Sequence, residues 1–166
     1  MVSIRQTSLY PALGGLILTA LVAGTSFADT SNTLTLELQG EENVLDIVQE
    51  HEPRSGTSQA QNVARIVLAG DRNGGYFPIW TRAAFATVPL APGRIEQQGI
   101  GNRMQLAVVG DYNQLSVLQR GHANNVGGRI RGTENAVAVA QYGNGNSASF
   151  SQTGTGNAIM ITQRAY

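Results

Sequence analysis

Hydrophobic and polar residues alternate along the chain in short runs, and these runs return at a fixed interval. In the last third, asparagine recurs every 11 residues. Counting this asparagine as position 0, positions 2 and 4 are mostly apolar and position 6 is often glutamine. Alternation with a period of two predicts a β-strand with one buried face. The other face is small or polar, as in the run Ala136, Ala138 and Ala140.

Glycine at position 8 predicts the turn that ends each strand, because glycine accepts a positive φ without a steric clash. Seven strand residues and four turn residues make one arm of 11, and two arms make a coil of about 22 residues. The pattern therefore predicts an all-β fold, a β-solenoid of strand–turn–strand coils with cross-β-like stacking and irregular inserts. The predicted ladder residues are Asn102, Asn113, Asn124, Asn135, Asn146, Asn157, Gln97, Gln119, Gln141, Gln152 and Gln163, and the turn glycines are Gly99, Gly110, Gly121, Gly132, Gly143 and Gly154.

Stacked coils would place like residues over one another, about 4.8 Å apart. A primary amide both donates and accepts hydrogen bonds, so stacked amides can bond along the axis. A buried amide without partners would cost about 1–3 kcal/mol. The ends of such a stack present open strand edges, which invite another chain to add.

Two departures interrupt the pattern in its regular part. Val108 and Ile130 stand where glutamine is expected, which predicts two breaks in the glutamine ladders. The segment 124–131 contains Gly127 and Gly128 together with arginines, which predicts a poor strand. Interruptions of this kind slow edge-to-edge growth.

The N-terminal segment, 1–28, reads as a secretory signal peptide. Arg5 supplies a positive start, Leu13–Val22 forms a short apolar run, and Ser26–Ala28 resembles a cleavage site, so the mature chain is predicted to start at Asp29. The alternative is a membrane anchor. The apolar run of about ten residues is short for a span, which needs about 20.

The rest of the chain divides into residues 29–93, predicted as degenerate repeats with loops, and residues 94–166, predicted as the regular solenoid. In the first part, Thr30–Gln49 predicts one coil and Asn62–Ile79 a degenerate coil whose second arm contains Pro78. Proline cannot donate to a strand ladder, which weakens this arm. Together the repeats amount to about five coils.

Two segments break the phase of the repeat. Glu50–Gln61 has loop composition, and Trp80–Arg94 contains prolines and a glycine that mark an irregular insertion. Trp80 and Phe85 are predicted to pack on the side of the solenoid; the alternative is that they contact a partner subunit or a secretion channel.

Composition excludes several classes of function. The chain has 11 basic and 11 acidic residues and no cysteine. This balance implies neither nucleic acid nor an anionic membrane as a partner, and no disulfide or cysteine-ligated metal is available. Acidic residues gather between 37 and 52 and arginines gather after residue 94. Ends of opposite charge would favour head-to-tail addition, although a screened, solvated surface explains the same pattern.

No catalytic, cofactor-binding or metal-binding residues are predicted. His51 has no second histidine nearby, and His122 falls in a turn. Gly143–Gly145 belongs to the repeat's turn and lacks the strand–loop–helix context of a phosphate-binding loop.

The spacing of the last units resembles the curlin repeat of curli fimbriae, Ser/Asn-x5-Gln-x-Gly-x2-Asn-x5-Gln. Here it reads Asn135-x5-Gln141-x-Gly143-x2-Asn146-x5-Gln152-x-Gly154-x2-Asn157-x5-Gln163. The resemblance implies a secreted subunit of extracellular amyloid fibres that acts in adhesion and biofilm matrix. It implies export through the periplasm of a Gram-negative-type bacterium to cell-surface fimbriae. The implied partners are copies of itself, other curli-type subunits and the outer-membrane secretion and assembly machinery, with no nucleic acid and no membrane span after signal cleavage.

The sequence leaves two functions open and disfavours a third. Within the fibre reading, the chain is either a major subunit or a minor, nucleating one, and the arginines and the lapses at Val108 and Ile130 favour the minor type. The second reading is a non-polymerising β-solenoid adhesin or binding module, whose mark would be a regular outward row of one residue type. The third is an enzyme on a β-helix, such as a polysaccharide lyase. Such enzymes have wider coils with three faces, and coils of two 11-residue arms are too thin to build one.

Overall fold

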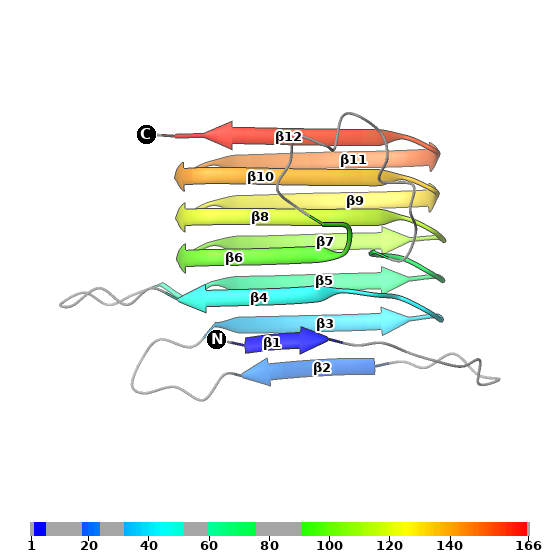
Figure 1. The fold of residues 1–166 in the computed structure, drawn as a ribbon, viewed down its shortest axis with the longest axis horizontal. Helices are drawn as coiled ribbons and strands as arrows, with labels where there is room; N and C mark the ends of the chain where they lie inside the picture. The colour runs from blue at the N-terminus through cyan, green and yellow to red at the C-terminus, as the bar shows by residue number, and fades with distance from the viewer. Residues whose placement is uncertain (1, 6–17, 24–31, 52–59, 76–90, 166) are drawn as a thin grey trace.

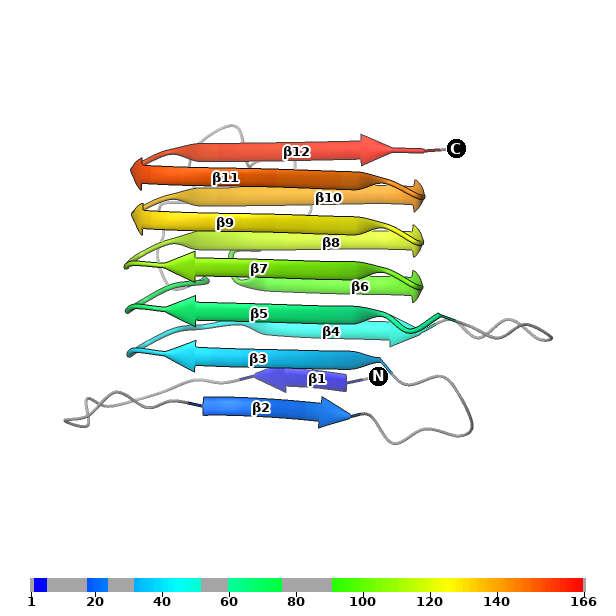
Figure 2. The ribbon, with the colours of Figure 1, turned by 180° about the vertical axis from the view of Figure 1, so that it is seen from behind.

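Two six-stranded β-sheets face each other, and successive strands from β3 onward alternate between them (Figures 1 and 2). The structure is a computed structural model that describes residues 2–5, 18–23, 32–51, 60–75 and 91–165. Sheet A has the order β1-β4-β6-β8-β10-β12, and sheet B the order β2-β3-β5-β7-β9-β11. The strands are β1 Val2–Arg5, β2 Leu18–Ala23, β3 Thr33–Gln39, β4 Asp46–His51, β5 Val63–Ala69, β6 Arg94–Ile100, β7 Arg103–Val109, β8 Gln114–His122, β9 Asn125–Thr133, β10 Ala136–Asn144, β11 Ser147–Thr155 and β12 Ala158–Arg164.

Each coil consists of one sheet B strand followed by one sheet A strand, and the coils stack in parallel. Val137 of β10 lies beside Leu115 of β8 and Ile159 of β12, so each residue of these coils stacks on the equivalent residue two arms away in the sequence. Five such coils run from β3/β4 to β11/β12. The predicted β-solenoid, built from two arms per coil, is confirmed. None of the described residues forms a helix of the length and hydropathy that a membrane span would need.

The second coil departs from the predicted arm at Asn73–Ile79. Gly74 bridges to the first and third coils, and the strand then resumes at Gly93, whose amide donates to the carbonyl of Leu115. The prediction for this arm is therefore wrong: β6 supplies it. β6 brings Gln97 to position 6, where it extends an amide ladder, whereas the local sequence offers Ile79. Residues 76–90, including Trp80 and Phe85, lie outside the described residues, so their predicted packing is untested.

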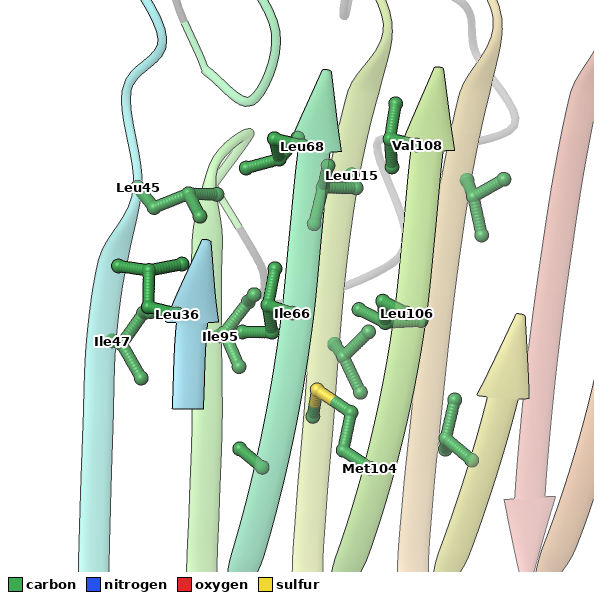
Figure 3. Packing of buried hydrophobic residues seen from close by; sticks show 14 of the residues in the cluster. Leu36, Leu45, Ile47, Ile66, Leu68, Ile95, Met104, Leu106, Val108 and Leu115 are labelled. Atoms are coloured by element: carbon green, nitrogen blue, oxygen red, sulfur yellow. The ribbon is translucent and has the colours of Figure 1, made fainter. Parts of the chain in front are cut away.

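The hydrophobic core lies between the two sheets and is built from positions 2 and 4 of the arms, together with position 6 of sheet B in four coils. Figure 3 shows Leu36 and Ile66 from sheet B lying close to Ile47 and Ile95 from sheet A. All four side chains are at most 2% exposed. The alternation in the sequence thus sorts each strand into a buried and an outer face, as a period of two requires.

Strand β9 is complete, so the prediction of a poor strand over residues 124–131 is wrong. Gly128 takes a core position between Leu106 and Phe150. A Cβ built on Gly128 would lie 2.0 Å from the Phe150 ring, which shows that the ring occupies the space left by the missing side chain. A large residue in the next coil therefore compensates for the glycine and keeps the core filled.

The turns require positive φ at two positions. Gly121, at position 8, has φ +116°, and a Cβ there would lie 2.2 Å from the carbonyl oxygen of Gly143 in the next coil. Position 10 is also left-handed, and five of its residues are not glycine: Glu42, Arg72, Tyr112, Ala123 and Glu134. The sequence interpretation recognised only position 8, although the recurrence of Gly101, Gly145 and Gly156 at position 10 carried the signal.

Candidate assembly site: the amide columns and the ends of the stack

Position 6 of sheet A forms an unbroken column of five glutamines. Each of the first four side chains donates from Nε2 to the Oε1 of the next glutamine, at 2.7–2.9 Å. Each Nε2 also donates to a backbone carbonyl of sheet B, as Gln119 does to Arg103 at 3.0 Å. Four members are at most 2% exposed, and hydrogen bonding along the axis explains how buried amides are tolerated there. The column contains Gln49, Gln97, Gln119, Gln141 and Gln163.

Position 6 of sheet B is aliphatic in four coils and carries glutamine only in the last. Val108 pairs with Leu68 and Ile130, and Ile130 pairs with Gln152. The expectation that Val108 and Ile130 break two glutamine ladders is therefore wrong. Because alternate arms lie in different sheets, all of these substitutions fall in one column and the glutamine ladder of the other column stays whole.

Two further columns of asparagine follow the turns at the two edges of the stack. In each, the asparagine of a later coil donates its backbone N–H and its Nδ2 to the Oδ1 of the preceding coil, as Asn124 does to Asn102 at 3.1 and 3.0 Å. Nδ2 also donates to a turn carbonyl, as from Asn124 to Gly143 at 2.9 Å. The asparagines of the regular coils occupy these columns: Asn102, Asn124 and Asn146 form one, and Asn113, Asn135 and Asn157 the other.

The asparagine and glutamine columns have opposite directions. Asparagine donates toward the N-terminal end of the stack and glutamine toward the C-terminal end. At the C-terminal end, Asn157 is exposed and Ile159 and Ile161 are only partly buried. In the asparagine columns and in the glutamine column of sheet A, this end therefore presents the same groups, in the same directions, that join one coil to the next inside the molecule.

Gln152 differs from every other buried glutamine at position 6. It is 4% exposed, yet neither its Nε2 nor its Oε1 has a hydrogen-bond partner in the part of the chain that the structure describes. Its neighbour on one side is Ile130, and β11 is the last strand of sheet B. A buried amide without partners is costly, so a group on the open side would stabilise it.

The outer face of sheet A carries paired charges. Glu96 accepts hydrogen bonds from Arg120 at 2.9 Å and from Arg94 at 3.1 Å. Partial burial raises the pKa of Glu96, but these two arginines outweigh burial and hold the pKa below its ordinary value. The hydrogen bond to Glu96 likewise raises the pKa of Arg120. Arg94 also lies 3.4 Å from Asp46, so an acidic residue of the first coil is paired with an arginine of the second.

Over β5, β7, β9 and β11, the outer face of sheet B is basic and hydroxyl-rich. Arg65, Arg103, Arg129 and Arg131 are exposed there, and the outward positions of β11 carry serine and threonine. No acidic residue occurs in β5, β7, β9 or β11, four strands that are described throughout. A hollow lies over Gly127 and Gly128 beside Arg129. Across these four strands, the face lacks a continuous row of one residue type.

The candidate chemical groups considered in the sequence lie on different coils along one edge of sheet A. His51 at the end of β4 and His122 at the end of β8 are both at this edge, with β6 between their strands. Gly143 and Gly145 lie in a turn with positive φ. The described residues contain no group of three or more acidic, histidine or cysteine side chains that could hold a metal ion.

Comparison with known families agrees with this geometry. Residues 132–164 match the model of the curlin associated repeat. The match covers the turn after β9 and strands β10–β12, where amide columns and turn glycines are both present. The resemblance to the curlin repeat is thereby confirmed over these residues, and curlin repeats are units of structural fibre proteins rather than enzymes. No match was found among curated proteins.

Proposed function

We propose that the chain is a structural subunit of curli-type extracellular fibres and that it polymerises by end-to-end stacking of its coils. The observation that carries the proposal is the set of amide columns that run through the stack and end at an open strand pair, β11 and β12. An incoming coil would repeat the bonds that already join five coils. Adding a strand to an open edge is a common mode of protein association, because the backbone supplies most of the hydrogen bonds.

The other end of the stack supports the same proposal. There β1 pairs with β4 and β2 with β3, both in antiparallel orientation. Both strands fall within the predicted signal peptide, residues 1–28. Its removal would leave β3 and β4 as the N-terminal edge, with the parallel register of the solenoid available to a second molecule.

Localisation and partners follow from this proposal. A subunit of this type acts at the cell surface, after export through the periplasm by an outer-membrane secretion machinery, and it contributes to adhesion and biofilm matrix. The aliphatic column of sheet B departs from a full set of glutamines, which favours the minor, nucleating role over the major one. On the same basis we propose residues 29–166 as one working unit, since the stack is continuous across residue 94.

The test is fibre formation by the chain that begins at Asp29. Thioflavin T fluorescence should rise after a lag, and fibre diffraction should give a meridional spacing of about 4.7–4.8 Å. Ile161→Lys places a charge in the column that an incoming coil would bury and should abolish growth at this end. Met160→Lys, one residue away on the outer face and 45% exposed in the wild type, is the matched control and should still form fibres. A chain that stays folded and monomeric for days would refute the fibre function.

A further inference from the structure

The C-terminal end of the stack contains one buried amide that is unsatisfied within the part of the chain that the structure describes. Gln152 is 4% exposed and both of its polar side-chain atoms are without partners among the described residues. The corresponding glutamine of the other sheet, Gln163, accepts from Gln141 at 2.7 Å and donates to Ser147 at 2.9 Å. Gln152 is therefore aligned like a ladder residue but has aliphatic Ile130 beneath it.

The chemistry that would satisfy Gln152 can be read from the sheet A column. There each glutamine meets another glutamine in the next coil, Nε2 to Oε1. A coil stacked on β11 and β12 would need an amide at position 6 of both strands to continue both columns. A serine or an aliphatic residue would be too short or would lack the donor and acceptor.

A second copy of this chain does not meet that requirement. Stacked head to tail, its first coil would place Gln49 on Gln163, which matches the existing ladder. It would place Leu38, the position 6 residue of β3, on Gln152. Leu38 would bury the amide without offering a hydrogen bond, and leaving a buried polar group unpaired is the penalty that discriminates between partners.

We propose that Gln152 is a specificity residue and that the C-terminal end docks a different curlin-type subunit, one whose first coil carries glutamine at position 6 of both strands, in preference to a second copy of this chain. The inference rests on the proposed fibre function. The chain then acts as an end that starts growth of another subunit better than it extends itself. The asymmetry resides in one residue pair, Gln152 against Leu38.

The experiment is a double-mutant cycle on this pair with the chain from Asp29. At the joint, which is the contact between two stacked chains, Leu38→Gln pairs an amide with an amide and Gln152→Leu pairs two aliphatic residues. The double variant reverses the mismatch. The measured quantity is the monomer concentration left at the end of fibre growth. We expect each single variant to lower it about tenfold relative to the wild type, and the double variant to return it to about the wild-type level, because a tenfold change corresponds to the cost of one unpaired buried amide.

Two outcomes overturn the inference, and they are distinguishable from failure of the fibre function. Equal residual monomer for all four chains, or additive effects in the double variant, would mean that the pair does not govern the joint although fibres form. Absence of fibres from all four chains would refute the fibre function itself and the inference with it. Val108→Gln, in the same column but inside the stack, should show no coupling to position 152.

Discussion

The two sheets solve the same packing problem at position 6 with opposite chemistry. Sheet A stacks five glutamines whose amides bond to one another, whereas sheet B stacks four aliphatic residues, from Leu38 to Ile130. Both columns are buried in the same stack and have the same spacing. The difference teaches that either chemistry is stable when a column is uniform, because the cost lies in the junction where an amide meets an aliphatic neighbour.

The outer faces of the two sheets also differ, in whether their charged side chains are paired. In sheet A the charges are paired through Glu96, Arg94 and Arg120, while the outer face of sheet B carries arginines without an acidic residue on β5 to β11. In sheet A, the buried glutamine column and the Glu96 cluster on the outer face are therefore both paired within the molecule. In sheet B, the amide of Gln152 has no hydrogen-bond partner among the described residues, and the outward arginines of β5, β7 and β9 have no acidic residue on these strands. Groups from another molecule could pair with both.

The largest expected effect concerns the turns, which set the coil spacing in both sheets. Gly121→Ala should destabilise the chain by about 3–5 kcal/mol, because φ there is strained for any other residue and the added methyl would collide with the Gly143 carbonyl. Chemical denaturation of the freshly prepared chain measures the loss. Gly127→Ala is the matched control, since nothing lies within 4 Å of its Cβ position; it should stabilise the strand by about 0.5–1 kcal/mol. Equal effects at the two sites would show that the turns do not fix the coil spacing.

The next effect addresses the amide column directly. Gln119→Leu should cost about 2–4 kcal/mol, because it removes the bonds to Gln97, Gln141 and the carbonyl of Arg103 and leaves buried polar atoms unpaired. Chemical denaturation gives the magnitude. A cost below about 0.5 kcal/mol, the size of an ordinary surface substitution, would show that the ladder does not stabilise sheet A.

The reciprocal change in sheet B sharpens the comparison. Val108→Gln places a lone amide between Leu68 and Ile130, at a site that is 1% exposed. We expect a loss of about 1–3 kcal/mol by the same denaturation measurement. An unchanged free energy of unfolding would mean that sheet B accepts a lone glutamine anywhere in this column. The aliphatic column would then not determine which partner the C-terminal end binds.

Much of the fold follows from the sequence because the repeat enforces it. The recurring asparagine, the alternation and the position 8 glycine together determine strand, turn and coil, so the solenoid and five coils were predictable. The interpretation of Val108 and Ile130 did not assign alternate arms to different sheets. The structural period is two arms rather than one, and this separates the glutamine column from the aliphatic one.

Other features could not be predicted because they depend on contacts between coils. Gly128 reads as a defect in its own strand, and only the neighbouring coil shows that Phe150 fills its place. The split second coil depends on β6 matching Gln49 and Gln119 on either side, a choice that local propensity around Pro78 does not reveal. The unpaired state of Gln152 likewise follows from its place at the end of sheet B.

The smallest expected effect concerns the paired charges of sheet A. The pKa of Glu96 is held below its ordinary value by Arg120 and Arg94 despite partial burial. Folding therefore favours the ionised form: the stabilisation is complete above the unfolded pKa of about 4.3 and is lost as the pH falls through the lower pKa of the folded state. Glu96→Gln should cost less than about 1 kcal/mol at pH 7, because the two arginines that it pairs with are solvent-accessible and water screens the interaction.

The measurement is the difference in unfolding free energy between the wild type and Glu96→Gln from pH 7 down to about pH 2, at which carboxyl groups are protonated. The difference should shrink toward zero at the acidic end. Arg129→Gln on sheet B is the matched control and should show no such trend, because no acidic residue occurs on its own strand or on the two strands beside it. A difference that is constant with pH would mean that Glu96 acts through packing and that the two outer faces do not differ in the pairing of their charges.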